Sequence, residues 1–304
     1  MRPSRVYGPT VFGSCAASAC TPRFVRAIDI PLIPCFLVVR PVTAPVVRCL
    51  RIGVVADGPV GVLYGPCNSS TDGTPLRQKR VDSGGRLDLI AVPPGRVLLA
   101  DRRTQRTWSV DLAPYALAVH PLTQDDYARL TGERPSASAG GRLPVESVSW
   151  WDAVRCCNAL SEEQRLTPAY RLDPEAEQAD WDADADGYRL PTEAEWEHAC
   201  RAGTDAARYG ELDEIAWYRG NSGERPHEVG GRRPNAFGLH DMLGNVWEWC
   251  WDLYDPEVYG TYRVLRGGGW FDEHWSCRAS VRRRSHPTLR LEDVGFRPAR
   301  NLPA

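Results

Sequence analysis

The distribution of tryptophan constrains this chain more than any other feature of its sequence. All 11 tryptophans lie between Trp108 and Trp275 of the 304 residues. Because each indole ring buries a large apolar area, we expect the main core to form after residue 93. Charge changes at the same place, since residues 1–93 hold 11 basic and 5 acidic residues and the remainder holds 26 and 34. We predict an N-terminal region over 1–93 and a domain over 94–304.

The N-terminal region shows short β-type runs and no catalytic motif. "VVRCLRIGVVA", "VGVLYG", "RLDLIAV" and "GRVLLADR" are interrupted by Asp-Gly, Gly-Gly and Pro-Pro, which predicts a small β-region or a partly ordered segment. "IPLIPCFLVV" is too short and too rich in proline to span a membrane. The net charge of −2 gives no basic field for nucleic acid. We expect a cytoplasmic protein, with a secreted or lipid-anchored chain as the alternative.

The ten cysteines do not follow a disulfide or zinc pattern. No C-x-x-C pair occurs, and no Cys/His set has zinc-finger spacing. We expect mostly buried or free thiols in a reducing compartment; the alternative is a secreted chain with disulfides.

Three segments carry the signals of short capped helices. They are "LTQDDYARLTG", "SWWDAVRCCNAL" and "LPTEAEWEHACRAG", with predicted N-caps Thr123, Ser149 and Thr192. In all three, an acid follows the cap by three residues: Asp126, Asp152 and Glu195. "WSVDLAPYALAV" is a candidate strand pair, and "YRVLRGGGW" is a strand that ends in glycines. Little periodicity follows residue 203, so we predict an α+β domain with much irregular structure.

One stretch matches the calcium loop of an EF-hand. "DADADGYRLPTE" (182–193) has acids at alternate positions, a glycine and a closing glutamate. The preceding segment contains Pro174 and no apolar stripe, and Glu193 suits the first turn of a helix. We therefore favour a solvated acidic turn.

Three further stretches together resemble the signature blocks of the formylglycine-generating enzyme (sulfatase-modifying factor) family. They are "GYRLPTEAEWEHACRAG", "PNAFGLHDMLGNVWEWCWD" and "YRVLRGGGW…CRASVRRRSHP…VGFRPAR". The resemblance covers about 94–302 in the family's order. It implies the formylglycine-generating-enzyme fold, an α+β fold related to C-type lectins.

The resemblance implies a reaction and also a departure from it. Active members oxidise a substrate cysteine to Cα-formylglycine with O2 and copper(I), held by two cysteines with four residues between them. The second cysteine falls on Cys277 and the first on Asp272. A carboxylate is a poor copper(I) ligand, so this departure argues against oxidase activity. Cys250 is an alternative source of a second thiol.

Two functions therefore remain open for the glycine-rich segment. The first is a protein-modifying oxidase with a groove near 270–277 that binds a peptide or ligand, and a sulfatase is the candidate protein partner. The second, which the missing cysteine favours, is a non-catalytic module that binds a protein or ligand. The candidate binding residues are Trp270, Asp272, His274 and Trp275. A non-haem iron enzyme is the least favoured reading, because the six histidines form no H-x3-H-x-E motif.

The resemblance also implies a structural calcium loop at "DMLGNVWEW". Asp241 and Glu248 would offer carboxylate oxygens, and Gly244 and Val246 would offer backbone carbonyls. Calcium accepts such mixed oxygen ligands.

Overall fold

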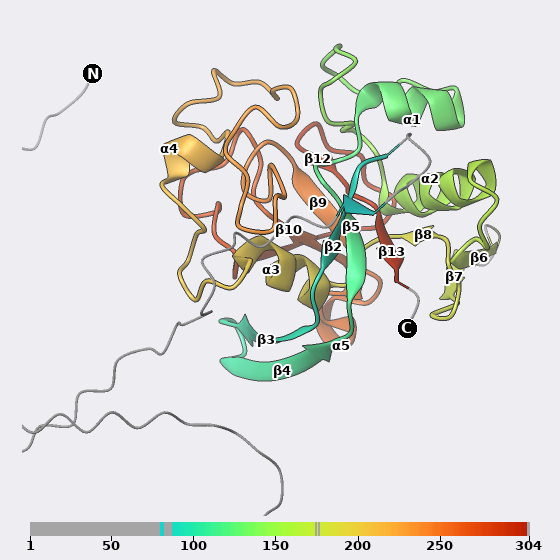
Figure 1. Ribbon diagram of the computed structural model, residues 1–304, viewed down its shortest axis with the longest axis horizontal. Coiled ribbons are helices and arrows are strands. Elements are labelled where there is room, and N and C mark those ends of the chain that lie inside the picture. The colour runs from blue at the N-terminus through green and yellow to red at the C-terminus, as the bar shows by residue number, and fades with distance from the viewer. Residues whose placement is uncertain (1–79, 82–86, 174, 176, 303–304) are drawn as a thin grey trace, which may run out of the picture. The chain divides into compact units, whose positions relative to one another are not determined.

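The computed structural model describes residues 80–81, 87–173, 175 and 177–302 (Figure 1). The runs "VVRCLRIGVVA" and "VGVLYG" lie outside the described residues. The described chain is an α+β structure of two main sheets, two hairpins, helices and long irregular loops. This agrees with the predicted fold class.

The larger sheet has five antiparallel strands in the order β1-β2-β5-β13-β8. They are β1 (Arg80–Val81), β2 (Leu89–Val92), β5 (Tyr115–Ala118), β8 (Tyr188–Arg189) and β13 (Ala299–Asn301). β2 lies between β1 and β5, so the predicted boundary at residue 93 is wrong, because it would cut a strand from the sheet that it completes.

The second sheet has four strands in the order β11-β10-β9-β12, and only β12 runs parallel to its neighbour. They are β9 (Trp247–Leu253), β10 (Arg263–Arg266), β11 (Arg282–Ser285) and β12 (Val294–Gly295). The predicted strand in "YRVLRGGGW" is confirmed as β10.

Two hairpins stand beside these sheets. One joins β3 (Gly95–Asp101) to β4 (Arg106–Leu112), and the other joins β6 (Tyr170–Asp173) to β7 (Gln178–Trp181). Both strands predicted in "WSVDLAPYALAV" form, but β4 pairs with β3 and β5 with β2 and β13. The β6–β7 hairpin stands where an EF-hand needs its entering helix, and the Glu193 carboxylate is bound by Arg282. Residues 182–193 therefore do not form an EF-hand.

The three predicted helices are present, and their N-caps are confirmed. The helices are α1 (Gln124–Thr131), α2 (Trp150–Glu163) and α3 (Glu193–Arg201), with the single-turn helices α4 (Leu212–Ile215) and α5 (Pro256–Tyr259). Ser149 and Thr192 each accept a hydrogen bond from the backbone of the third residue after them, and Asp152 and Glu195 return the bond. These capping boxes satisfy amide groups that the first helical turn leaves free.

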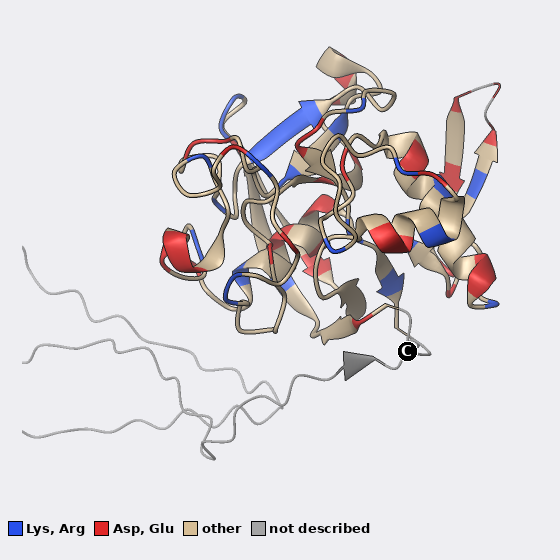
Figure 2. Ribbon diagram, turned by 90° about the horizontal axis from the view of Figure 1, so that it is seen from above, with Lys and Arg blue, Asp and Glu red and all other residues tan. Residues whose placement is uncertain are grey.

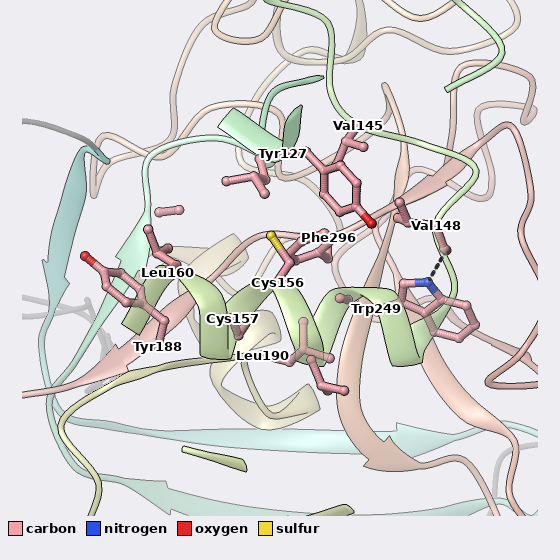
Figure 3. Packing of buried hydrophobic residues seen from close by; sticks show 14 of the residues in the cluster. Tyr127, Val145, Val148, Cys156, Cys157, Leu160, Tyr188, Leu190, Trp249 and Phe296 are labelled. Carbon is pink, nitrogen blue, oxygen red and sulfur yellow. Dashed lines mark hydrogen bonds between the residues drawn. The ribbon is translucent and has the colours of Figure 1, made fainter. Parts of the chain in front are cut away.

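Tryptophan fills much of the core, as its distribution predicted. Trp150, Trp196, Trp247 and Trp249 are buried, and Figure 3 shows Trp249 donating to the Val148 carbonyl close to the side chains of α2. All five cysteines in the described part of the chain are free and buried.

Acidic and basic side chains are interspersed over the described elements (Figure 2). Among the residues described, no helix is both long enough and apolar enough to cross a membrane.

Candidate functional site

The glycine-rich segment after β10 turns sharply and folds back on itself. Gly267 and Gly268 have φ angles of 103° and 83°, which side-chain-bearing residues rarely adopt. A Cβ atom on Gly268 would lie 2.9 Å from the Cys277 sulfur, so a larger residue would clash there. Cys277 therefore packs directly against the turn that follows β10.

Asp272 is held by hydrogen bonds inside this turn. Its Oδ2 accepts from the Trp247 indole nitrogen at 2.5 Å and from the Gly269 backbone nitrogen at 3.0 Å. Its Oδ1 lies 3.5 Å from a guanidinium nitrogen of Arg283, and its side chain is only 15% exposed. The carboxylate is therefore already used to join the turn to β9 and β11.

Cys277 is buried, and its thiol is difficult to ionise. Burial, and next the negative charge of Asp272, raise the pKa of the Cys277 thiol to about 12. Arg208 donates to the Cys277 carbonyl oxygen at 2.9 Å, which fixes the backbone. Because the thiolate is the form that attacks substrates and binds metals, the neutral thiol at pH 7 is unreactive.

The exposed side of the same segment is aromatic. Phe271 is 52% exposed and Trp275 is 53% exposed, and the His274 ring lies 4.9 Å from the Trp275 ring. The Arg219 guanidinium lies 5.3 Å from the centre of the Phe271 ring. We call Phe271, His274 and Trp275 the aromatic rim. It offers both apolar area and polar edges to a partner.

The structure separates the four predicted binding residues into two groups. His274 and Trp275 lie on the rim, whereas Trp270 is buried and donates to the Glu292 carbonyl at 3.2 Å. Trp270 is therefore much less accessible than His274 and Trp275, and its role in ligand binding stays a prediction. The sequence did not single out Phe271, because which of the neighbouring rings Trp270 and Phe271 is exposed depends on the tertiary fold.

The loop 241–246 has the tight backbone that its glycine predicted. Gly244 has a φ of 75°, and a Cβ there would come within 2.3 Å of the Trp217 carbonyl oxygen. Asp241 is buried, and its Oδ2 accepts from the Gly230 nitrogen at 2.7 Å. Its Oδ1 is buried without a hydrogen-bond partner, and burial raises the pKa of this carboxyl.

Glu248 faces a buried arginine. Its two oxygens each lie 2.7 Å from a nitrogen of the Arg297 guanidinium, and one also accepts from the Trp196 indole at 2.7 Å. Both charged groups are essentially inaccessible to solvent. This pair connects β9 to the chain between β12 and β13.

Comparison with known proteins identifies the family. Residues 78–302 match the model of the sulfatase-modifying factor enzyme 1-like domain. The chain belongs to the sulfatase-modifying factor family. The chaperone protein LppX of Paenibacillus barcinonensis is 33% identical over 220 residues, which cover 60% of this chain and 78% of LppX.

A curated enzyme and a solved structure are also similar to this chain. The formylglycine-generating enzyme of Streptomyces coelicolor is 36% identical over 206 residues, 57% of either chain. The solved structure of Treponema denticola variable protein 1 has a TM-score of 0.65 and 31% identity, covering 75% of this chain and all of that one. This chain thus spans little more than half of the enzyme.

The copper chemistry associated with this family does not fit the residues at the predicted position. Copper(I) favours soft thiolates, whereas here one of the two positions carries Asp272, which Trp247 and Gly269 already bind. The other carries Cys277, which by itself offers one sulfur ligand where the resemblance implies two. Among the described residues, no three or more His, Cys, Asp or Glu side chains are grouped as a metal site.

The predicted calcium ligands of the family fit only in part. Glu248 does not fit, because a calcium ion would have to compete with the Arg297 cation for both of its oxygens. Asp241 retains one oxygen without a hydrogen-bond partner. Asp241 and the carbonyls of Gly244 and Val246 thus remain predicted ligands.

Proposed function

We propose that this member of the sulfatase-modifying factor family is a peptide- or protein-binding domain and not a copper-dependent oxidase. The observation that carries the proposal is the role of Asp272. Where the resemblance requires a copper cysteine, its carboxylate accepts from Trp247 and Gly269 and holds the turn. Asp272 therefore stabilises the conformation of the turn and does not serve as a copper ligand in this proposal.

The aromatic rim is the proposed contact surface. Phe271 and Trp275 are each about half exposed, and aromatic side chains are favoured at the centres of protein interfaces. The LppX relative carries the name of a chaperone protein, which supports a protein ligand. The sulfatase sequence Cys-x-Pro-x-Arg is one candidate peptide, bound without being oxidised.

The first experiment tests the absence of oxidase chemistry. Copper(I) is titrated anaerobically against a competing chelator, and O2 uptake and aldehyde formation are then followed with a Cys-x-Pro-x-Arg peptide. An active formylglycine-generating enzyme is the positive control. We expect no stoichiometric tight copper binding and no aldehyde. Aldehyde formation that Cys277→Ser abolishes would overturn the proposal.

The second experiment tests the rim. A displayed peptide library is selected on the wild-type domain, and the selected peptides are measured against a Phe271→Ala/Trp275→Ala double variant. We expect at least a tenfold rise in Kd, since loss of such aromatic contacts costs about 2 kcal/mol or more. Leu98→Ala is the matched control, because Leu98 is an exposed apolar residue on β3. Equal losses in both variants would remove the rim from the proposal.

Calcium binding is proposed only through Asp241, Gly244 and Val246. The buried Oδ1 of Asp241 without a hydrogen-bond partner is the observation in its favour. Adding a calcium chelator is expected to lower the melting temperature of the wild type and to leave that of Asp241→Asn unchanged. An unchanged transition in the wild type would eliminate the site.

A further inference from the structure

A cavity of about 600 Å³ is lined by residues of the β3–β4 hairpin, the start of α3 and residues 252–257. Figure 1 shows the β3–β4 hairpin and α3. Arg282 of β11 lines it, whereas the next residue, Arg283, lies 3.5 Å from Asp272. Successive side chains of a strand point to opposite faces. The cavity is therefore separated by β11 from the segment that carries the proposed function.

The walls of this cavity combine carboxylates with aromatic rings. Trp108 and Tyr254 supply the rings. The charged residues that line it are Asp101, Arg106, Glu193, Asp252, Asp255, Glu257 and Arg282. Its volume is within the usual range for small-ligand sites.

Three of these carboxylates already have cationic partners. Glu193 accepts from Arg282 at 2.5 and 2.8 Å, and Asp255 is bound by Arg103. Asp101 lies 3.6 Å from both Arg103 and Arg282. These pairs neutralise one another and hold the walls in place.

Asp252 is different, because among the described residues no cation forms a close ion pair with it, although it interacts at longer range with the charge of Arg263. Its Oδ2 accepts from the Glu193 backbone nitrogen at 2.6 Å. Burial, and next the charge of Glu193, raise the pKa of the Asp252 carboxyl to about 6. An ionised carboxylate in such surroundings gains from a nearby cation.

One guanidinium group of the chain already lies over the two aromatic rings of the cavity. The Arg282 guanidinium lies 5.3 Å from the centre of the Trp108 ring and 4.7 Å from that of Tyr254. A cation over an aromatic face is attracted by the ring electrons. Trp108 and Tyr254 line the cavity together with Asp252.

We propose that this cavity binds an organic cation, a guanidinium or ammonium group, on the Asp252 carboxylate beside Trp108 and Tyr254. The cation comes either from a free small molecule or from an arginine or lysine side chain of a peptide. This site is independent of the aromatic rim. Either one can fail without affecting the other.

The test is calorimetric titration of the full chain with N-acetyl-arginine amide at pH 7.5. N-acetyl-citrulline amide is the neutral analogue of matched shape. We expect binding of the arginine compound, and a Kd at least tenfold higher for the citrulline compound, because a hydrogen bond to a charged group is worth about 1.5–3 kcal/mol. Binding should weaken toward pH 5, as Asp252 takes up a proton. Equal affinity for the two compounds, or no binding of the arginine compound, would overturn the proposal.

Two variants locate the site. Asp252→Asn keeps an acceptor for the Glu193 nitrogen but removes the charge, and it should raise the Kd at least tenfold. Asp111→Asn is the matched control, because Asp111 is an exposed acid on the same hairpin that pairs with Arg96 outside the cavity. If Asp252→Asn does not fold, Trp108→Leu serves instead. Unchanged affinity in the folded variant contradicts the proposal.

Agmatine and an alanine pentapeptide with one central arginine then distinguish the two sources. Tighter binding of agmatine identifies a free small cation, and tighter binding of the pentapeptide identifies a peptide side chain. Failure of both to bind would count against the cavity as a cation site.

Discussion

At the scale of single residues, Asp272 and Gly268 decide what the segment after β10 can do. The Asp272 carboxylate joins two donors from different parts of the chain, Trp247 and Gly269. Gly268 permits the close approach of Cys277. Both residues serve the turn, so we expect their substitution to affect stability.

The first prediction concerns Asp272. Asp272→Ala leaves the partly buried donors of Trp247 and Gly269 without an acceptor, and it should lower the free energy of unfolding by about 1–3 kcal/mol. Asp272→Asn keeps one acceptor oxygen and should cost less. Urea unfolding followed by tryptophan fluorescence measures both. An alanine variant as stable as the wild type would show that the carboxylate does not hold the turn.

The second prediction concerns the packing of Gly268 against Cys277. Gly268→Ala adds a Cβ atom 2.9 Å from the sulfur at a φ of 83°, so it suffers both strain and a clash. Gly223→Ala is the matched control, since Gly223 has a φ of 62° and open space around it. We expect the control to lose about 1 kcal/mol, from backbone strain alone, and Gly268→Ala to lose at least twice as much. Thermal unfolding compares them, and equal losses would refute the contact.

At the scale of elements, the helices begin where their local caps predict. Thr192 and Glu195 form a complete capping box, and Glu195 also accepts two hydrogen bonds of 2.7 Å from Arg189 of β8. The start of α3 is therefore tied both to its own first turn and to the larger sheet.

The third prediction separates these two roles. Thr192→Ala removes only the cap and should cost about 1 kcal/mol, whereas Thr192→Ser should be close to wild type. Glu195→Ala also leaves the buried Arg189 without its carboxylate and should cost about 3–5 kcal/mol. Chemical denaturation gives the three values. A Thr192→Ala loss as large as that of Glu195→Ala would mean that the cap, and not the ion pair, dominates.

At the scale of the whole molecule, buried ion pairs connect distant parts of the chain. Glu248 of β9 binds Arg297, 49 residues later, and Arg297 also donates to the carbonyls of Ala118 and Asp241. One guanidinium thus links the larger sheet, the loop at 241 and the second sheet.

The fourth prediction tests this connection. Glu248→Gln leaves the buried charge of Arg297 uncompensated and should lower stability by about 3–5 kcal/mol. The double variant Glu248→Gln/Arg297→Met should recover part of that loss. A double-mutant cycle from urea denaturation gives the coupling. Additive losses would show that the two residues do not interact.

Features that depend on neighbours a few residues apart could be predicted from residue order. The helix caps at Thr123, Ser149 and Thr192 are of this kind, because a capping hydrogen bond spans only three residues. The strand before the glycines and the family resemblance also rest on short runs of sequence. Features that depend on contacts between distant residues become visible only in the folded chain. It pairs Glu248 with Arg297, and it buries Trp270 and exposes Phe271. Such outcomes depend on which side chains meet across the core, and no local pattern records those meetings.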